Sequence, residues 1–251
     1  MAPKEFVAAV RRLNAIVVVL FAIFVSLAPG AQAEALRKVA VVSFGLFGDQ
    51  DVFRSESTGA AQIVARRFGG DPVIVQFNTK KGGGATIEGL EASLQATAEK
   101  LNRESDILFV ILTSHGARNG LVVVRGRLRQ LLPPWALGAM VDRTGIRHKV
   151  IVISACYSGT FIPRLADPDV MVVTAADADH PSFGCQDKAK WTYFGDAFFN
   201  VALRRADNLR SAFDQARMLV RERELREGFD PSNPQLAGGE NVEPLLVVHR
   251  Q

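Results

Sequence analysis

The sequence predicts an α/β fold, in which a mostly parallel β-sheet carries helices on both faces. Uninterrupted apolar runs such as "ILFVILT" and "KVIVIS" are typical of strands buried on both sides. Amphipathic stretches with helical spacing alternate with these runs. The composition, 48% hydrophobic and 22% charged, can supply a core for one such domain.

The strands follow from the apolar runs. Five buried strands are predicted at 38–44, 73–79, 107–113, 149–154 and 170–176. A short extra strand is expected at 121–124, after a glycine-containing loop, and an edge strand at 243–248.

The helices follow from the 3.6-residue period of apolar positions. They are expected at 55–68, 85–103, 127–143, 191–205 and 209–228. The second has Ile87, Leu90 and Leu94 on one face. The third is interrupted by Pro133 and Pro134, which cannot donate backbone hydrogen bonds.

The N-terminal segment has the layout of an export signal. A basic start is followed by the apolar "AIVVVLFAIFVSLA" and by Ala31-Gln32-Ala33, a small-residue cleavage pattern. We therefore expect residues 1–33 to be a signal peptide and 34–251 a single domain, exported to the periplasm or secreted. The uncharged run 13–33 leaves an uncleaved anchor in the inner membrane as the alternative.

Charge and motifs exclude several functions. Removing residues 1–33 takes away three basic residues and one acidic residue, so the formal charge falls from +4 to +2. No basic run with interleaved aromatics suggests nucleic-acid binding. Asp177 and Asp179 lack companion ligands for a metal, and "KKGGGAT" lacks the order of a phosphate loop. We expect no cofactor, and membrane contact only through the N-terminal segment.

Chemistry in such a sheet collects past the carboxyl ends of the strands, an edge called the rim below. The segments that follow the strands are "GLFGDQDVFRSE", "SHGARNG", "ACYSG" and "DADHPSFGCQD". The reactive side chains they bring to the rim, with one from the next helix, are Arg54, His115, Cys156, Asp177, Asp179, Cys185 and Asp196.

Cys156 stands where a strand ends, which suits a nucleophile. A free thiol is mostly protonated at neutral pH and needs an imidazole to activate it. Among four histidines, only His115 ends a buried run and precedes a glycine, while His180 is a weaker rival. Gly116 would let a carbonyl approach the backbone, pairing its N–H with that of Cys156 as an oxyanion site. Spacing alone leaves open a structural cysteine and histidine.

These motifs resemble the caspase-like clan of cysteine peptidases, and most closely its legumain-type C13 family of asparaginyl endopeptidases. The resemblance rests on "VFRSE", "FVILTSHGARNGLVVV", "KVIVISACYSG" and "VVTAADADHPSFGCQDKAKWTYFGDAFF", in that order. The resemblance covers most of residues 38–205. Among relatives, the sequence looks most like the bacterial exported branch.

The resemblance implies a caspase-like three-layer sandwich and an endopeptidase acting on proteins or peptides. It makes His115 the imidazole and Cys156 the nucleophile. Arg54 and Asp196 would read the two ends of a substrate amide side chain, which implies cleavage after Asn or Asp. Ser154 occupies a pocket position that is acidic in legumains.

The sequence also departs from the legumain pattern. Ser55, Ser114 and Val52 replace a histidine, an acidic residue and an asparagine. The lost pocket residues at Ser55, Ser114 and Ser154 favour a catalytically weak or dead peptide-binding relative. A transpeptidase using the same cysteine is a separate alternative, in which an amine releases the acyl-enzyme. Cys185 is expected to be free and mostly buried, with a redox switch or a static bridge to Cys156 as alternatives.

Overall fold

The computed structural model describes residues 37–249, so the expected signal peptide lies outside the described residues. Its main sheet has the order β10-β9-β8-β4-β1-β2-β3. The strands β1 (Val39–Gly45), β2 (Gly70–Thr79), β4 (Ile107–Thr113), β8 (His148–Ser154) and β9 (Val170–Thr174) are parallel. The edge strands β3 (Gly82–Gly83) and β10 (Gln235–Ala237) are antiparallel.

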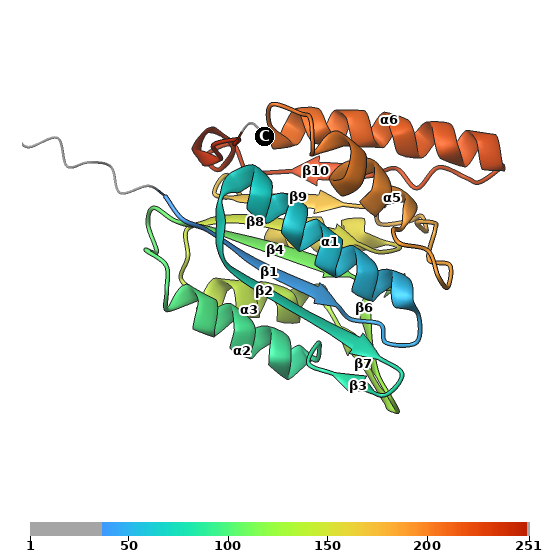
Figure 1. The fold of residues 1–251 in the computed structure, drawn as a ribbon, viewed down its shortest axis with the longest axis horizontal. Helices are drawn as coiled ribbons and strands as arrows, with labels where there is room; N and C mark the ends of the chain where they lie inside the picture. Colours follow the sequence, from blue (N-terminus) through green and yellow to red (C-terminus); the bar gives the residue numbers. More distant parts are fainter. Residues whose placement is uncertain (1–36, 250–251) are drawn as a thin grey trace, which may run out of the picture. The chain divides into compact units, whose positions relative to one another are not determined.

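Helices cover both faces of this sheet, which confirms the three-layer α/β sandwich (Figure 1). One face carries α1 (Asp51–Phe68), α5 (Tyr193–Gly195), the π-helical turn η2 (Asp196–Ala202) and α6 (Leu209–Glu227). The other carries α2 (Ile87–Ala98), α3 (Pro134–Arg143) and α4 (Ile162–Leu165), which follows the short η1 turn (Ser158–Phe161).

Alternation along the strands explains why their sequences are uniformly apolar. On β4, Ile107, Phe109 and Ile111 enter the core beneath α1 and α6. Leu108, Val110 and Leu112 enter the core beneath α2 and α3. Because neighbouring side chains point to opposite faces and both faces are covered, consecutive positions from Ile107 to Leu112 must be apolar.

The region 127–143 corrects one prediction. Residues 128–132, expected in a helix, form β7 (Leu128–Leu132), which pairs with β6 (Gly120–Arg125) in a small sheet completed by β5 (Gly116–Ala117). Gly126, with φ of 56°, makes the turn between β6 and β7. Helix α3 begins at Pro134, with Pro133 as its N-cap residue, so a proline occupies its first turn.

The predicted C-terminal edge strand is also wrong. Residues 243–245 form a 3₁₀ turn, η3 (Glu243–Leu245), and the edge strand is β10. With three residues, β10 is too short for alternation to mark it. The helix expected at 191–205 begins at Tyr193 and changes to π-helix at Asp196.

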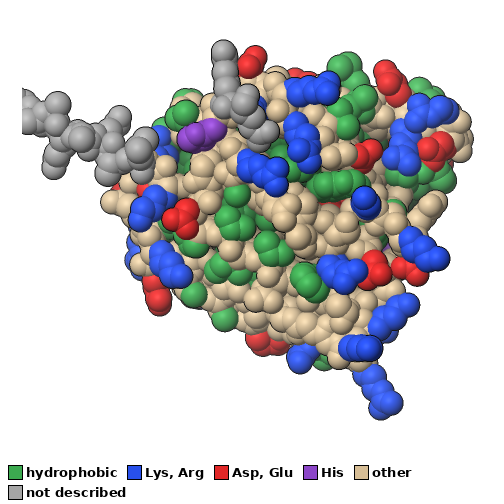
Figure 2. All heavy atoms as spheres, in the orientation of Figure 1, with side chains coloured by type: hydrophobic (Ala, Val, Ile, Leu, Met, Phe, Trp, Pro, Cys, Tyr) green, Lys and Arg blue, Asp and Glu red, His purple; other side chains and the backbone are tan. Residues whose placement is uncertain are grey.

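The surface shows mixed charge. On the face seen in Figure 2, basic and acidic side chains are interspersed with small apolar areas. Among residues 37–249, no helix combines the length and apolarity needed to cross a membrane.

Candidate active site

The register of β4 and β8 brings the two predicted reactive residues to neighbouring strand ends. Thr113 and Ser154 are the last paired residues of these parallel strands. His115 and Cys156 each follow two positions later. The Ser114 amide also donates to the Ser154 carbonyl at 3.2 Å, which keeps the two segments together beyond the sheet.

Gly116 and Cys156 are in direct backbone contact. A Cβ atom placed on Gly116 would lie 2.0 Å from the carbonyl oxygen of Cys156, closer than any side chain permits. Glycine is therefore required here by the close approach of the two chains. This contact places the two predicted oxyanion residues side by side.

His115 is oriented by the start of helix α1. Its Nε2 lies 2.6 Å from Oε1 of Gln50, and the Gln50 Nε2 donates to the Cys185 carbonyl at 2.8 Å. Because that second bond fixes which end of the amide is oxygen, Nε2 of His115 carries the proton. The ring nitrogen Nδ1 is then left with its lone pair.

The imidazole of His115 is also partly removed from water. Its ring meets those of Phe47 and Phe53 edge-on, with centroid distances of 4.6 and 5.0 Å. This burial lowers the pKa of His115, because the charged form is poorly solvated. The neutral base is therefore the favoured form near pH 7.

Cys156 is held by the loop that follows β9. Its Sγ accepts from the Ser182 amide and donates to the Ser182 carbonyl, both at 3.3 Å. Within residues 37–249, no hydrogen bond joins His115 to Cys156. Tyr157, directly after the cysteine, has φ of 55°, an uncommon conformation for a bulky residue.

Cys185 lies close to the same centre. Both cysteines are free, and Cys185 is mostly buried with a part of its surface accessible, as expected for it. Burial, together with the charges of Cys156 and Glu56, raises the pKa of Cys185 to about 12. Its thiol is therefore protonated and a poor nucleophile.

The two predicted specificity residues have other partners. Arg54 pairs with Asp51 at 3.2 Å and lies 5.9 Å above the Phe77 ring, on β2. Two strands, β1 and β4, separate β2 from β8. Asp196 accepts from Asn200 at 2.8 Å and faces Arg223 at 4.0 Å. Over the described chain, no ion pair joins Arg54 to Asp196.

The side chain of Ser154 lies in the interior of the fold. It is 1% exposed, and its hydroxyl is 3.2 Å from that of Thr192. In this conformation it faces the ends of the neighbouring elements rather than the open rim.

Further rim residues tie the loops to one another. The Asp177 carboxylate lies 2.7 and 2.8 Å from Nδ1 of His180 and accepts from Asn233 at 3.0 Å. Arg118 pairs with Asp179 and covers the Tyr157 ring at 5.3 Å. In the described part of the chain, no group of three or more His, Cys, Asp or Glu residues could hold a metal.

Sequence reasoning missed three residues of this site: Gln50, Ser182 and Glu56. Gln50 was placed in a loop because the helix was expected to begin at Ser55, whereas α1 begins at Asp51. Ser182 acts through its backbone, for which residue type gives no signal. Glu56 fell within the helix expected at 55–68 without a role, yet it is fully buried.

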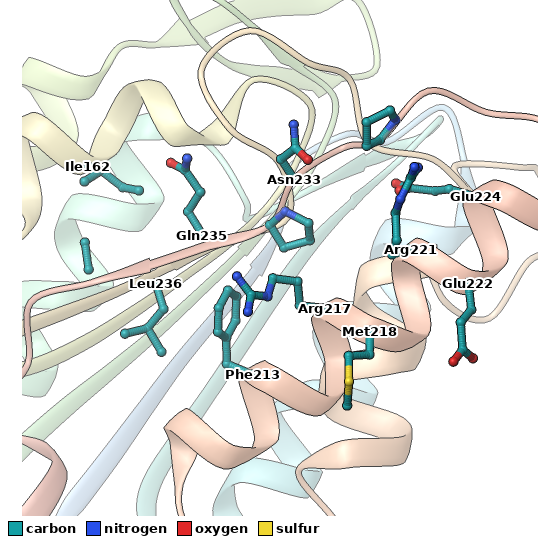
Figure 3. A pocket seen from close by; sticks show the side chains of 13 residues that line it. Ile162, Phe213, Arg217, Met218, Arg221, Glu222, Glu224, Asn233, Gln235 and Leu236 are labelled. Carbon is teal, nitrogen blue, oxygen red and sulfur yellow. The ribbon is translucent and has the colours of Figure 1, made fainter.

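A cavity of about 800 Å³ lies elsewhere, between α6 and β10 (Figure 3). Phe213, Arg217 and Arg221 of α6 line one side, and Gln235 and Leu236 of β10 line another. A second cavity of about 270 Å³ includes Asp196 and Arg223. Neither cavity is lined by His115 or Cys156.

A parallel sheet with a cysteine and a histidine at adjacent strand ends defines the caspase-like class of cysteine peptidases. The chain belongs to the peptidase C13 family, whose model matches residues 79–242. That stretch contains His115 and Cys156 but not Arg54. Legumain-type peptidases of this family act on proteins or peptides.

Two other comparisons set the fold in context. The crystal structure of caspase-1 from Spodoptera frugiperda is similar, with a TM-score of 0.54 and 16% identity over 80% of this chain and 85% of that one. At this identity the likeness concerns the fold alone. No curated protein matches the chain.

Proposed function

We propose that the chain is an endopeptidase that cleaves peptide bonds with Cys156 as nucleophile and His115 as base. The observation that carries this proposal is the register of β4 and β8, which ends both strands at the same level two residues before the pair. Membership of the peptidase C13 family supports it.

The hydrogen bonds support particular roles for individual atoms in this proposal. Nδ1 of His115 takes the thiol proton, since Nε2 is committed to Gln50. Sγ attacks the scissile carbonyl and forms a tetrahedral oxyanion, which the N–H groups of Gly116 and Cys156 stabilise. His115 then returns the proton to the leaving amine, and water hydrolyses the acyl-enzyme. Attack requires Sγ to leave its bonds with Ser182.

Cleavage after Asn or Asp is the finer part of the proposal. It rests on the match of Arg54 and Asp196 to the legumain pocket. Both residues would have to exchange their present partners, Asp51 and Arg223, for substrate. A preference for a different P1 side chain would leave the chemistry at Cys156 unchanged.

The test uses residues 34–251, reduced, beside the Cys156→Ala variant, on a fluorogenic peptide library varied at P1. Cleavage that disappears in the variant supports the endopeptidase, and preference for Asn or Asp supports the pocket. Equal cleavage by both proteins would place the nucleophile elsewhere and contradict the proposal.

A second candidate is a peptide-binding relative without turnover. The observation that favours it is that Sγ of Cys156 is bonded to Ser182 and the His115 ring to Gln50, and that no hydrogen bond joins the two side chains within residues 37–249. This candidate predicts peptide binding in the Cys156→Ala variant equal to wild type, with no acyl-enzyme detected by mass.

We further propose that residues 1–33 direct export to the periplasm or the outside. The basic start, the apolar stretch and Ala31-Gln32-Ala33 support this. N-terminal sequencing of the mature protein tests it: a start at Glu34 agrees with cleavage, and an intact Met1 indicates the anchor.

A further inference from the structure

A carboxylate is buried directly beneath the dyad. Glu56, in the second turn of α1, is 0% exposed. Its Oε1 accepts from the Thr113 hydroxyl at 2.8 Å, and its Oε2 accepts from the Thr192 amide at 2.8 Å. Gly195 packs so closely that a Cβ there would lie 2.0 Å from Oε2.

These bonds connect the strand ends that carry the reactive residues. Thr113 is the last residue of β4, two positions before His115. Ser154 ends β8 two positions before Cys156, and its hydroxyl lies 3.2 Å from that of Thr192, whose amide donates to Glu56. The carboxylate therefore bridges α1, β4, β8 and the start of α5.

Stability alone does not explain an acid in this place. Burying a carboxylate is costly unless it is paired, and within the described chain Glu56 forms no ion pair. Well-packed apolar residues often replace such buried charges without loss of stability. What an apolar side chain cannot do is accept hydrogen bonds from several segments at once.

We propose that Glu56 is a positioning residue that sets the spacing of His115 and Cys156 through Thr113 and the Ser154–Thr192 pair. This inference rests on the proposed function. Helix α1 then orients the imidazole twice, from the rim through Gln50 and from below through Glu56. Glu56 touches no substrate, so its loss lowers kcat and leaves KM nearly unchanged.

The protonation of Glu56 gives an independent readout. Burial raises the pKa of Glu56, and the hydrogen bonds from Ser154, Thr192 and Thr113 offset only part of that effect. The folded chain therefore binds this proton more tightly than the unfolded chain, and stability falls as pH rises above 4.5. The elements around the carboxylate present hydroxyl and amide groups, and Cys185 is its titratable neighbour.

The experiment measures alkylation of Cys156 by iodoacetamide near neutral pH, mapped by mass so that Cys185 is scored separately. Wild type and the His115→Ala variant define the activated and unactivated rates. Glu56→Gln keeps the side-chain volume, but its NH2 group replaces a carboxylate oxygen that accepts from Thr113 or Thr192. The matched control is Glu224→Gln, a glutamate 1% exposed on α6 that accepts from the Ser232 amide at 3.0 Å.

We expect Glu56→Gln to lose about tenfold or more of the His115-dependent rate, because small displacements of reacting groups cost that much. Glu224→Gln stays within about twofold of wild type. Thr113→Val removes one hydrogen-bond donor to Glu56, so its alkylation rate also falls. Thr113→Ser keeps the hydroxyl and restores the rate. As pH rises above 4.5, the melting temperature of wild type falls relative to that of Glu56→Gln.

The outcomes separate the two levels of the account. Equal rates in wild type and His115→Ala overturn the proposed dyad and this inference with it. A clear His115 effect that Glu56→Gln and Thr113→Val both preserve overturns the positioning role alone. If Glu56→Gln does not fold, the Thr113→Val and Thr113→Ser pair decides the matter.

Discussion

His115 and Cys156 sit at the same level of the sheet, but they are held by different parts of the molecule. The histidine is fixed by α1, through the Gln50 amide and the aromatic ring of Phe53. The cysteine is fixed by the loop after β9, through backbone atoms of Ser182. The imidazole of His115 is therefore oriented by a packed helix, whereas the thiol of Cys156 is held by hydrogen bonds to a loop. Forming the reactive pair requires the loop contact to yield.

The largest loss of activity is expected at Gly116, where the segment after β4 touches the segment after β8. Gly116→Ala puts a methyl group 2.0 Å from the Cys156 carbonyl oxygen, so the rim must shift. Displacing an oxyanion donor lowers kcat/KM by about 10²-fold or more. Peptide cleavage by the purified variant measures this loss.

The matched control is Gly138→Ala on α3. The three atoms nearest its added Cβ all belong to the guanidinium end of Arg164, a flexible side chain that can move away. Activity near wild type in Gly138→Ala and a large loss in Gly116→Ala agree with the account. Full activity in Gly116→Ala would show that the contact has no role in the chemistry.

The helix side is tested next by Gln50→Ala. The variant frees the His115 ring and its tautomer, so kcat falls by about 10- to 100-fold with little change in KM. Gln130→Ala, which removes an exposed bond to Glu88, serves as the control. A Gln50→Ala enzyme with unchanged kcat would mean that the rings of Phe47 and Phe53 suffice to orient the base.

The pH profile gives a moderate effect with a definite sign. Burial lowers the pKa of His115, so the imidazole stays neutral to lower pH than an exposed histidine. The acid limb of kcat/KM should therefore lie below pH 6.5, and activity is lost as pH falls through it. An acid limb above 6.5 would indicate a charged partner at the ring that the structure does not show.

The smallest effect is expected from Arg118→Ala. The pair between Arg118 and Asp179 is exposed, with 64% and 70% of the two side chains accessible. Exposed ion pairs contribute little, so kcat should change by less than about threefold. Measuring kcat at low and high salt checks this, and a large loss would give the loop after β9 a stronger anchor than Ser182 provides.

Some of this architecture could be predicted from the sequence because strands buried on both faces of the sheet are continuous apolar runs. β4 spans the residues expected of it, 107–113, since its positions from Ile107 to Leu112 must all be apolar. β7 was mistaken for helix because "RLRQLL" has no clear period, and only pairing with β6 makes it a strand. β10 is too short to carry a pattern.

The site divides in the same way. The placement of His115, Gly116 and Cys156 at neighbouring strand ends could be predicted because each follows a strand run, while their catalytic roles stay predictions. Gln50 and Glu56 could not be predicted, because their roles depend on where α1 begins and on which face of it is buried. Arg54 and Asp196 were paired by likeness to a family, while their present contacts are set by local neighbours, Asp51 and Asn200.

The central claim is that Cys156 is a nucleophile activated by His115. The most direct measurement incubates wild type, His115→Ala and Cys156→Ala with a peptidyl chloromethyl ketone and maps the adduct by mass. The account predicts a covalent adduct on Cys156 in wild type, formed much more slowly in His115→Ala and absent from position 156 in Cys156→Ala. Adduct formation on Cys156 at the same rate with and without His115 would contradict it.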